Sequence, residues 1–180
     1  MTPERDLSVV ELWRYPVKSL RGERLELAEI EADGVRGDRA LRIDGERGLI
    51  TARTRPGLLG LRAAIGPDGE PEIDGRPWRS DHAGDAIRRM APGGSLVPTD
   101  GAEVGLRQDL SPVHVLTTAM VAELGVDFRR LRPNVLIDGA EGREEIGWIG
   151  STLRIGEVAL EVTAQCERCV MTTFDPDTIE

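Results

Sequence analysis

Short runs of alternating apolar and polar residues dominate the first 80 positions and predict strands joined by tight turns. Within 23–32, for example, apolar side chains recur at Leu25, Leu27 and Ile30. Aspartate followed by glycine separates several runs, as at Asp33 and Asp44, and this dipeptide is typical of hairpin turns. The runs that we predict as strands are 9–18, 23–32, 39–43, 49–53, 58–65 and 70–78.

The remainder of the chain predicts short helices among further strands. Ser80 or Asp81 can cap a helix that ends at Met90, before Pro92-Gly-Gly94. A second helix is expected over 119–124, capped by a threonine and ended by Gly125. Strands are expected at 135–137 and, as one or two strands, over the alternating run 153–164. Strands outnumber helices, so the pattern predicts a mostly β protein.

The length of 180 residues allows one large domain or two small intertwined ones. The stretch 92–105, rich in proline and glycine, is the best candidate for a seam between two halves. We therefore predict a β-rich unit over 1–95 and a second unit over 96–180.

Composition narrows the range of functions. A net charge of −9 argues against a nucleic-acid-binding protein, which needs a basic face. No apolar run is long enough to span a membrane, and the first residues do not resemble a signal peptide. We expect a cytoplasmic protein whose two cysteines stay reduced.

The positive charges carry a more specific signal. Of the 23 basic residues, Lys18 is the only lysine, and it follows an apolar run that ends at Trp13. A lysine ammonium is a compact point charge suited to a phosphate or another oxyanion, and arginine does not replace it without loss. Lys18 is thus a candidate anion ligand, although a surface lysine retained by chance explains it about as well.

Both cysteines, Cys166 and Cys169, lie near the end of the chain with Arg168 between them. A thioredoxin-like pair would need a helix after the motif, which the following proline turn disfavours. A structural zinc site would need further ligands, and the two histidines, His82 and His114, are far apart in sequence. Two inert cysteines are the third alternative, and the spacing alone does not decide between them. A thiol beside a guanidinium can nevertheless be held as a thiolate and used.

Five segments, in this order, resemble the MOSC family, named for the molybdenum cofactor sulfurase C-terminal domain. They are Arg14-Tyr-Pro-Val-Lys-Ser19, Gly37-Asp-Arg39, Thr51-Ala-Arg53, Leu131-Arg-Pro-Asn134 and Cys166-Glu-Arg-Cys-Val-Met-Thr-Thr-Phe-Asp-Pro-Asp-Thr178. The resemblance covers the chain from about residue 8 onward. It implies a MOSC-type β-barrel with an N-terminal β-rich subdomain and a few short helices.

The resemblance also implies a molybdenum–molybdopterin cofactor. Cys169 matches the family's thiolate ligand to molybdenum and is the expected catalytic and metal-binding residue. The residues that match cofactor contacts are Lys18, Ser19, Arg39, Thr117, Thr118, Arg132, Asn134 and Arg168. Soft thiolates suit such metals, and the cofactor's phosphate needs Arg or Lys partners. Cys166 matches no clear ligand position, and we expect it to be a packed core thiol.

The function implied by the resemblance is reduction of N-hydroxylated compounds such as hydroxylamines, amidoximes and N-oxygenated bases. The metal would take up the substrate's oxygen and would be re-reduced by an external flavin or iron–sulfur protein, because the chain lacks a ferredoxin-like cysteine set. The alternative is a non-catalytic cofactor carrier or a module that carries a persulfide on Cys169.

One departure concerns the C-terminus. Family members continue past the Asp-Pro-Asp-Thr motif into further strands, whereas this sequence stops at Glu180. If those strands are absent, we expect the edge at 158–163 to be unpaired and to form a homodimer.

Overall fold

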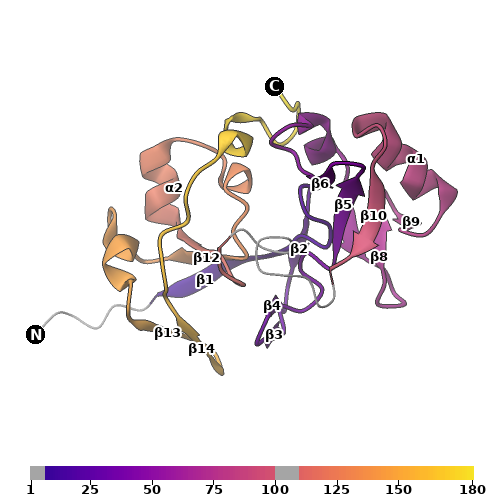
Figure 1. Cartoon of the computed structure of the whole chain (residues 1–180). Coiled ribbons are helices and arrows are strands. Elements are labelled where there is room, and N and C mark those ends of the chain that lie inside the picture. The colour runs from indigo at the N-terminus through magenta and orange to yellow at the C-terminus, as the bar shows by residue number, and fades with distance from the viewer. Residues whose placement is uncertain (1–6, 100–109) are drawn as a thin grey trace, which may run out of the picture.

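A computed structural model describes residues 7–99 and 110–180 and confirms the mostly β prediction (Figure 1). Strand pairing among these residues gives sheets of two to four strands. The two α-helices lie at opposite sides of the molecule, with α1 beside β10 and α2 beside β12.

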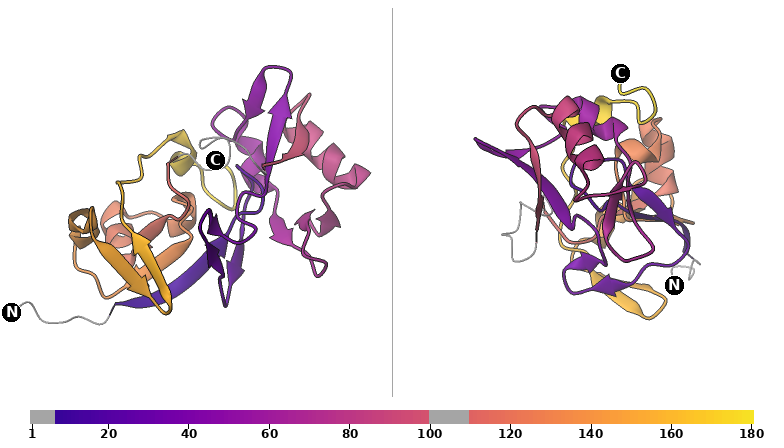
Figure 2. Two further views of the ribbon diagram at one scale, coloured as in Figure 1. Left: turned by 60° about the horizontal axis from the view of Figure 1, so that its bottom comes forward. Right: turned by 90° about the vertical axis from the view of Figure 1, so that its right-hand side faces the viewer.

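The largest sheet joins residues from both ends of the chain. Its order is β11-β12-β1-β2, with β1 at Ser8–Arg14, β2 at Glu23–Leu25, β11 at Val115–Thr117 and β12 at Val135–Asp138. β1 is antiparallel to both neighbours, and β11 runs parallel to β12. Because β1 pairs with β12 over a register that includes Leu12↔Val135, the two halves share a sheet (Figure 2).

The first half contains the larger core. In one sheet, β5 (Leu41–Gly45) lies between β6 (Gly48–Ile50) and β10 (Ser95–Pro98), and in another β8 (Pro71–Ile73) lies between β7 (Ala63–Ile65) and β9 (Arg76–Pro77). A hairpin of β3 (Ile30–Glu31) and β4 (Gly34–Val35) and the 3-10 helix η1 (Pro56–Gly60) complete this half. Leu20, Ile43, Leu58, Ile73 and Ile87 are fully buried among these elements.

Capping residues position both helices as predicted. α1 spans Asp81–Met90, and the Ser80 side chain accepts a hydrogen bond from the backbone N–H of Ala83. α2 spans Thr118–Leu124, with Thr117 as N-cap and Gly125 in the left-handed conformation after it. Each cap satisfies a backbone group that the helix end leaves unpaired.

The predicted strand boundaries needed correction in several places. The run 23–32 is not one strand, because it is interrupted between β2 and β3, where Leu27 is 81% exposed. The run 58–65 begins in η1, which has a proline in its first turn. The division at 95/96 falls inside β10, which pairs with β5 of the first half. The predicted seam 92–105 lies partly outside the described residues.

The second half has a smaller core, built on Leu116, Leu131 and Leu136. It also contains the 3-10 helices η2 (Phe128–Arg130), η3 (Glu144–Trp148) and η4 (Val170–Thr173). The predicted strand pair at 153–164 is a hairpin of β13 (Thr152–Ile155) and β14 (Val158–Glu161), and neither pairs with another described strand.

The C-terminal segment returns to the first half (Figure 1). Met171, Phe174 and Ile179 pack against the first core, and an Ile179 carbon lies 3.7 Å from the position of a Cβ built on Gly60. This return places the segment around Cys169 between the two halves.

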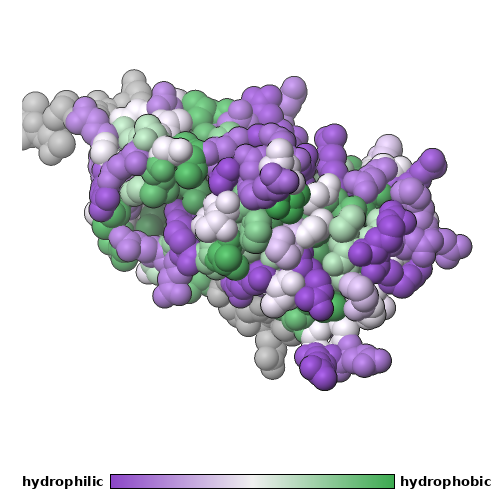
Figure 3. Space-filling view, turned by 90° about the horizontal axis from the view of Figure 1, so that it is seen from above, coloured by the Kyte–Doolittle hydropathy of each residue, from purple (hydrophilic) through white to green (hydrophobic). Residues whose placement is uncertain are grey.

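The face seen from above mixes apolar and polar patches (Figure 3). No helix among the described residues is long and apolar enough to cross a membrane.

Candidate functional site

A groove of about 800 Å³ lies where the two halves and the C-terminal segment meet. Four parts of the chain line it: residues of the first half, residues 110–115 with the loop before β12, residues of α2 and of 143–149, and the segment 158–172. It brings together most of the predicted site residues, namely Lys18, Ser19, Arg39, Arg132, Asn134, Arg168 and Cys169.

Tyr15 is the structural support beneath two of the arginines. The guanidinium carbons of Arg39 and Arg132 lie 4.8 and 4.2 Å from the centre of its ring. Its backbone N–H donates to Asp38 (2.7 Å), and its hydroxyl donates to the carbonyl of Pro133 (3.2 Å). Burial raises the pKa of Tyr15 to about 12, so the ring stays neutral and attracts both cations.

Three of the predicted site residues have an unusual backbone conformation. Ser19, Arg39 and Arg132 have φ values of 74°, 48° and 55°. Non-glycine residues rarely adopt positive φ, and such strain is concentrated at functional sites. The surrounding contacts that hold these conformations include the hydrogen bond from the Arg39 N–H to the Tyr15 carbonyl (2.7 Å).

The polar residues between the arginines are buried and hydrogen-bonded. The Ser19 hydroxyl accepts from the backbone N–H of Ala52 (3.0 Å), and Lys18 is only 8% exposed. Asn134 is 1% exposed and links both halves. Its amide donates to the Trp13 carbonyl (3.2 Å), and its side-chain oxygen accepts from the backbone N–H of His114 (3.1 Å).

Positive side chains outnumber negative ones around this groove, against the net charge of −9. Its cations are Lys18, Arg39, Arg53, Arg130, Arg132, Arg143 and Arg168, and its acids are Glu31, Glu145, Glu161 and Glu167. A cationic pocket in an acidic protein is suited to an anionic ligand.

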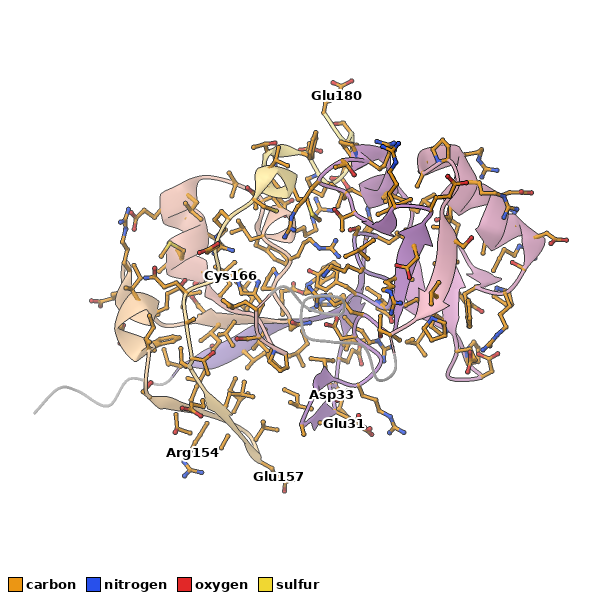
Figure 4. All side chains as sticks on the ribbon, in the orientation of Figure 1. Glu31, Asp33, Arg154, Glu157, Cys166 and Glu180 are labelled. Carbon is orange, nitrogen blue, oxygen red and sulfur yellow. The ribbon has the colours of Figure 1, made fainter. Side chains whose placement is uncertain are left out.

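The two cysteines differ in environment. Cys169 is half-buried at the start of η4, where its carbonyl accepts from the backbone N–H (3.0 Å) and the hydroxyl (2.9 Å) of Thr172. Cys166 is exposed on the segment between β14 and η4 (Figure 4), so the expectation of a packed core thiol was wrong.

Arg168 is oriented by a residue whose role the sequence did not indicate. Its guanidinium lies 3.5 Å from His114 Nε2, and the other ring nitrogen lies 3.4 Å from the carbonyl oxygen of Arg132. Burial, together with the positive charges of Arg168 and Arg39, lowers the pKa of His114 to about 4. The ring is therefore neutral at pH 7 and can accept a hydrogen bond from Arg168.

Thr117 and Thr118 are not brought to the groove. Thr117 is fully buried, and its side chain caps α2 while its N–H donates to Glu145 (2.8 Å). The Thr118 hydroxyl donates to Asp138. The Thr117 side chain is thus used by helix capping and the Thr118 side chain by Asp138, rather than by the groove.

Several groove residues were not predicted as site residues. Ser111 carried no sequence signal, and His114 was considered only as a possible zinc ligand. Thr51, Arg53 and Thr172 belong to quoted motifs in which they have no assigned role.

Comparison with known proteins gives the family. Residues 6–77 match the MOSC N-terminal beta barrel domain, and residues 108–180 match the MOSC domain. The chain is 30% identical to human mitochondrial amidoxime-reducing component 1 over 231 residues, which cover 95% of this chain and 67% of the human protein. This chain belongs to the MOSC family. Mitochondrial amidoxime reducing component 2 of Bos taurus (28%) and Macaca fascicularis (27%) also match 95% of this chain and 67% and 68% of their own lengths.

The two MOSC matches are separate along the sequence, although β1 and β12 join them in one sheet. The two matched regions leave 78–107 between them, which includes α1 and β10. The alignment to the human relative is longer than this MOSC chain, so the relative carries segments within the match that are absent here.

Proposed function

We propose that this MOSC protein is a molybdenum-cofactor-dependent reductase that removes oxygen from N-hydroxylated compounds such as amidoximes and hydroxylamines. The names of the relatives, amidoxime-reducing components, support the substrate class. The observation that carries the proposal is a single half-buried thiol, Cys169, on the wall of a cationic groove.

The donor set fits a metal that arrives already chelated. Within the described residues, no cluster of three or more His, Cys, Asp or Glu side chains could hold a metal ion. A metal bound at Cys169 must therefore receive its other ligands from a cofactor, and a dithiolene-bearing pterin supplies soft sulfur ligands of that kind. The groove's cations suit the cofactor's phosphate.

The residues have distinct proposed roles. Cys169 would hold the metal as a thiolate, and Lys18 with Arg39 and Arg132 would bind the anionic end of the cofactor. Tyr15 would fix the planes of Arg39 and Arg132, and Asn134, whose side-chain oxygen accepts from Arg39 (3.5 Å) and His114 (3.1 Å), would join Arg39 to His114. Arg168, held by His114, is the neighbour of Cys169 in the sequence, and its guanidinium would orient a polar substrate.

The groove also offers a place for the substrate's body. Its walls include apolar residues of the second half, among them Met120, Trp148 and Leu160. These side chains would pack against the hydrocarbon part of an N-hydroxy compound and exclude water from its N–O group. When bound, the molybdenum cofactor would supply the two-electron chemistry of N–O cleavage. An external reductase would provide the electrons, since the chain has only two cysteines.

The test is metal analysis and turnover of protein produced in a molybdenum-replete host. We expect about one molybdenum per chain and reduction of an amidoxime when a chemical or protein electron donor is present. Molybdenum without turnover across several N-hydroxy substrates and donors would favour a cofactor carrier. Absence of molybdenum, together with a persulfide on Cys169, would favour the sulfur-handling alternative.

A further inference from the structure

A second, smaller hollow of about 230 Å³ adjoins the cofactor groove. It lies where β1 and β2 of the first half meet η2 and the chain after Cys169, and Arg130, Arg132 and Met171 line both hollows. Six arginines line it, namely Arg21, Arg24, Arg62, Arg129, Arg130 and Arg132. The one acidic lining residue, Glu23, pairs with Arg14 (2.8 Å).

Two of these arginines are held side by side by the backbone. Arg21 and Arg62 are partners in a parallel bridge, in which the Arg21 N–H donates to the Leu61 carbonyl (2.9 Å) and the Ala63 N–H donates to the Arg21 carbonyl (2.8 Å). Both side chains reach the same hollow. Like charges placed opposite each other in a sheet are destabilising unless a counter-charge lies between them.

Two buried donors, on arginines that line this hollow, have no partner among the described residues. They are the Nε atoms of Arg21 and Arg130. The rest of each guanidinium is used, because Arg130 donates to the Thr173 carbonyl (3.0 Å) and to Asp175 (2.9 Å), and Arg21 donates to the Pro176 carbonyl. A buried, charged donor is rarely left unsatisfied, so these two arginines are not fully paired within the described residues.

Several lining arginines already pair with nearby carboxylates. Asp127 and Asp177 both accept from Arg129, Asp177 also lies 3.8 Å from Arg21, and Glu11 accepts from Arg24 (2.6 Å). Arg62, which is exposed, has no ion-pair or hydrogen-bond partner for its side chain among the described residues. An additional anion in the hollow would supply the counter-charge that Arg62 lacks.

The walls also indicate what the anion is attached to. Trp13, Tyr15 and Phe174 line the hollow together with Met171. The Trp13 ring is stacked with Tyr15 (6.4 Å between ring centres) and meets Phe128 edge-on (5.9 Å). Fixed aromatic rings beside guanidinium groups suit a planar apolar group that carries an oxyanion.

We propose that this hollow is a binding site for a small aromatic anion, a carboxylate or phosphate ester, separate from the cofactor groove. Its oxyanion would lie between Arg21, Arg62 and Arg130, and its ring would pack on Trp13 and Phe174. The volume of about 230 Å³ restricts the ligand to roughly one ring and one anionic group.

Titration calorimetry with benzoate, phenyl phosphate, inorganic phosphate and the neutral benzamide tests this site. We expect benzoate or phenyl phosphate to bind at least about 10-fold more tightly than benzamide, because the charge-assisted hydrogen bonds are lost with the charge. Tighter binding of phenyl phosphate than of inorganic phosphate would show that the ring contributes. Equal binding of benzoate and benzamide, or no binding of either aromatic anion, would overturn the proposal.

Variants separate this site from surface charge and from the cofactor. Arg62→Gln should weaken binding of the aromatic anion about 10-fold, whereas Arg154→Gln should not change it. Arg154 is the matched control, because it is exposed on β13 at the far hairpin (Figure 4). Cys169→Ser should bind the anion like the unmodified protein, so this result does not depend on the proposed reductase function. Unchanged affinity in a folded Arg62→Gln protein, verified by its melting temperature, would contradict the assignment.

Discussion

Cys169 and Cys166 are three positions apart and differ in burial. Both line the groove, but Cys169 is half-buried whereas Cys166 is exposed. We expect Cys169→Ser to lose most of the bound molybdenum, because a neutral hydroxyl does not replace a soft thiolate. Cys166→Ser should keep the metal and change the free energy of unfolding by less than about 0.5 kcal/mol, as is usual for surface substitutions. Molybdenum per chain and urea unfolding measure both effects, and equal metal loss in the two variants would point to a two-cysteine site.

Lys18 is almost fully buried beside the arginines of the groove. Lys18→Ala should weaken cofactor retention by roughly 1.5–3 kcal/mol, the strength of a hydrogen bond to a charged group. Lys18→Arg should recover part of this loss, because a planar guanidinium does not fit a point-charge site. Molybdenum retained after repeated gel filtration measures the effect, with Arg154→Ala as the control. Full retention by Lys18→Arg would mean that the single lysine is an accident of composition.

His114 should make the free energy of unfolding depend on pH. Burial and the charges of Arg168 and Arg39 lower its pKa from 6.5 to about 4, so the unfolded chain takes up the proton first as the pH falls. Stability present above pH 6.5 should therefore decline by about 1–3 kcal/mol between pH 6.5 and 4. Urea unfolding at pH 7 and pH 5 should show a smaller difference for His114→Gln than for the unmodified protein. An identical difference in both would show that other groups cause the decline.

Motif and residue type predicted Lys18, Arg39, Arg132 and Cys169 at one groove, and the structure places them there. The positive φ angles of Ser19, Arg39 and Arg132 were not predictable, because they depend on contacts such as Tyr15 with Asp38, 23 residues away. The choice of threonines failed for a related reason. A threonine hydroxyl can bind a ligand in a pocket, but it is also a good helix N-cap. Thr117 caps α2, and this role decides where its side chain lies.

At the scale of elements, local sequence signals predicted whether a segment is a helix or a strand better than they predicted where it begins and ends. Ser80 and Gly125 marked helix ends correctly, because caps act within one turn. The alternation over 23–32 predicted too long a strand. Alternation reflects burial only where the backbone stays paired in a sheet, and Leu27 lies outside any strand. The β1–β12 pairing joins residues more than 100 positions apart, and no local pattern specifies it.

Gly22 immediately precedes β2 and lies against Tyr15, the residue beneath Arg39 and Arg132. A Cβ at this position would lie 2.3 Å from the Arg14 carbonyl oxygen and 2.5 Å from a ring carbon of Tyr15. We expect Gly22→Ala to destabilise the fold by about 1–3 kcal/mol, as overpacking does, and to weaken molybdenum retention by shifting Tyr15. Gly147→Ala is the control, because no atom lies within 4 Å of its built Cβ. Equal unfolding midpoints for the two variants would show that the loop around Gly22 adjusts without strain.

At the scale of the whole molecule, three independent links connect the two halves. β1 pairs with both β2 and β12, the Tyr15 hydroxyl donates to the Pro133 carbonyl, and Met171 and Phe174 of the C-terminal segment pack on the first core. The cofactor groove lies between these links, so its shape depends on both halves remaining docked. The matched families divide the sequence in two, but the shared sheet predicts a single folding unit.

Calorimetry tests whether the two halves unfold as a single unit. We expect one thermal transition whose calorimetric and van't Hoff enthalpies agree. Leu116→Ala in the second core and Ile87→Ala in the first should each cost about 2–5 kcal/mol, because both side chains are fully buried. If the halves unfold together, either substitution lowers the midpoint of the same transition, and the molybdenum is released within it. Two transitions, each shifted by only one of the substitutions, would show that the halves fold independently and that the β1–β12 pairing holds together parts that are stable alone.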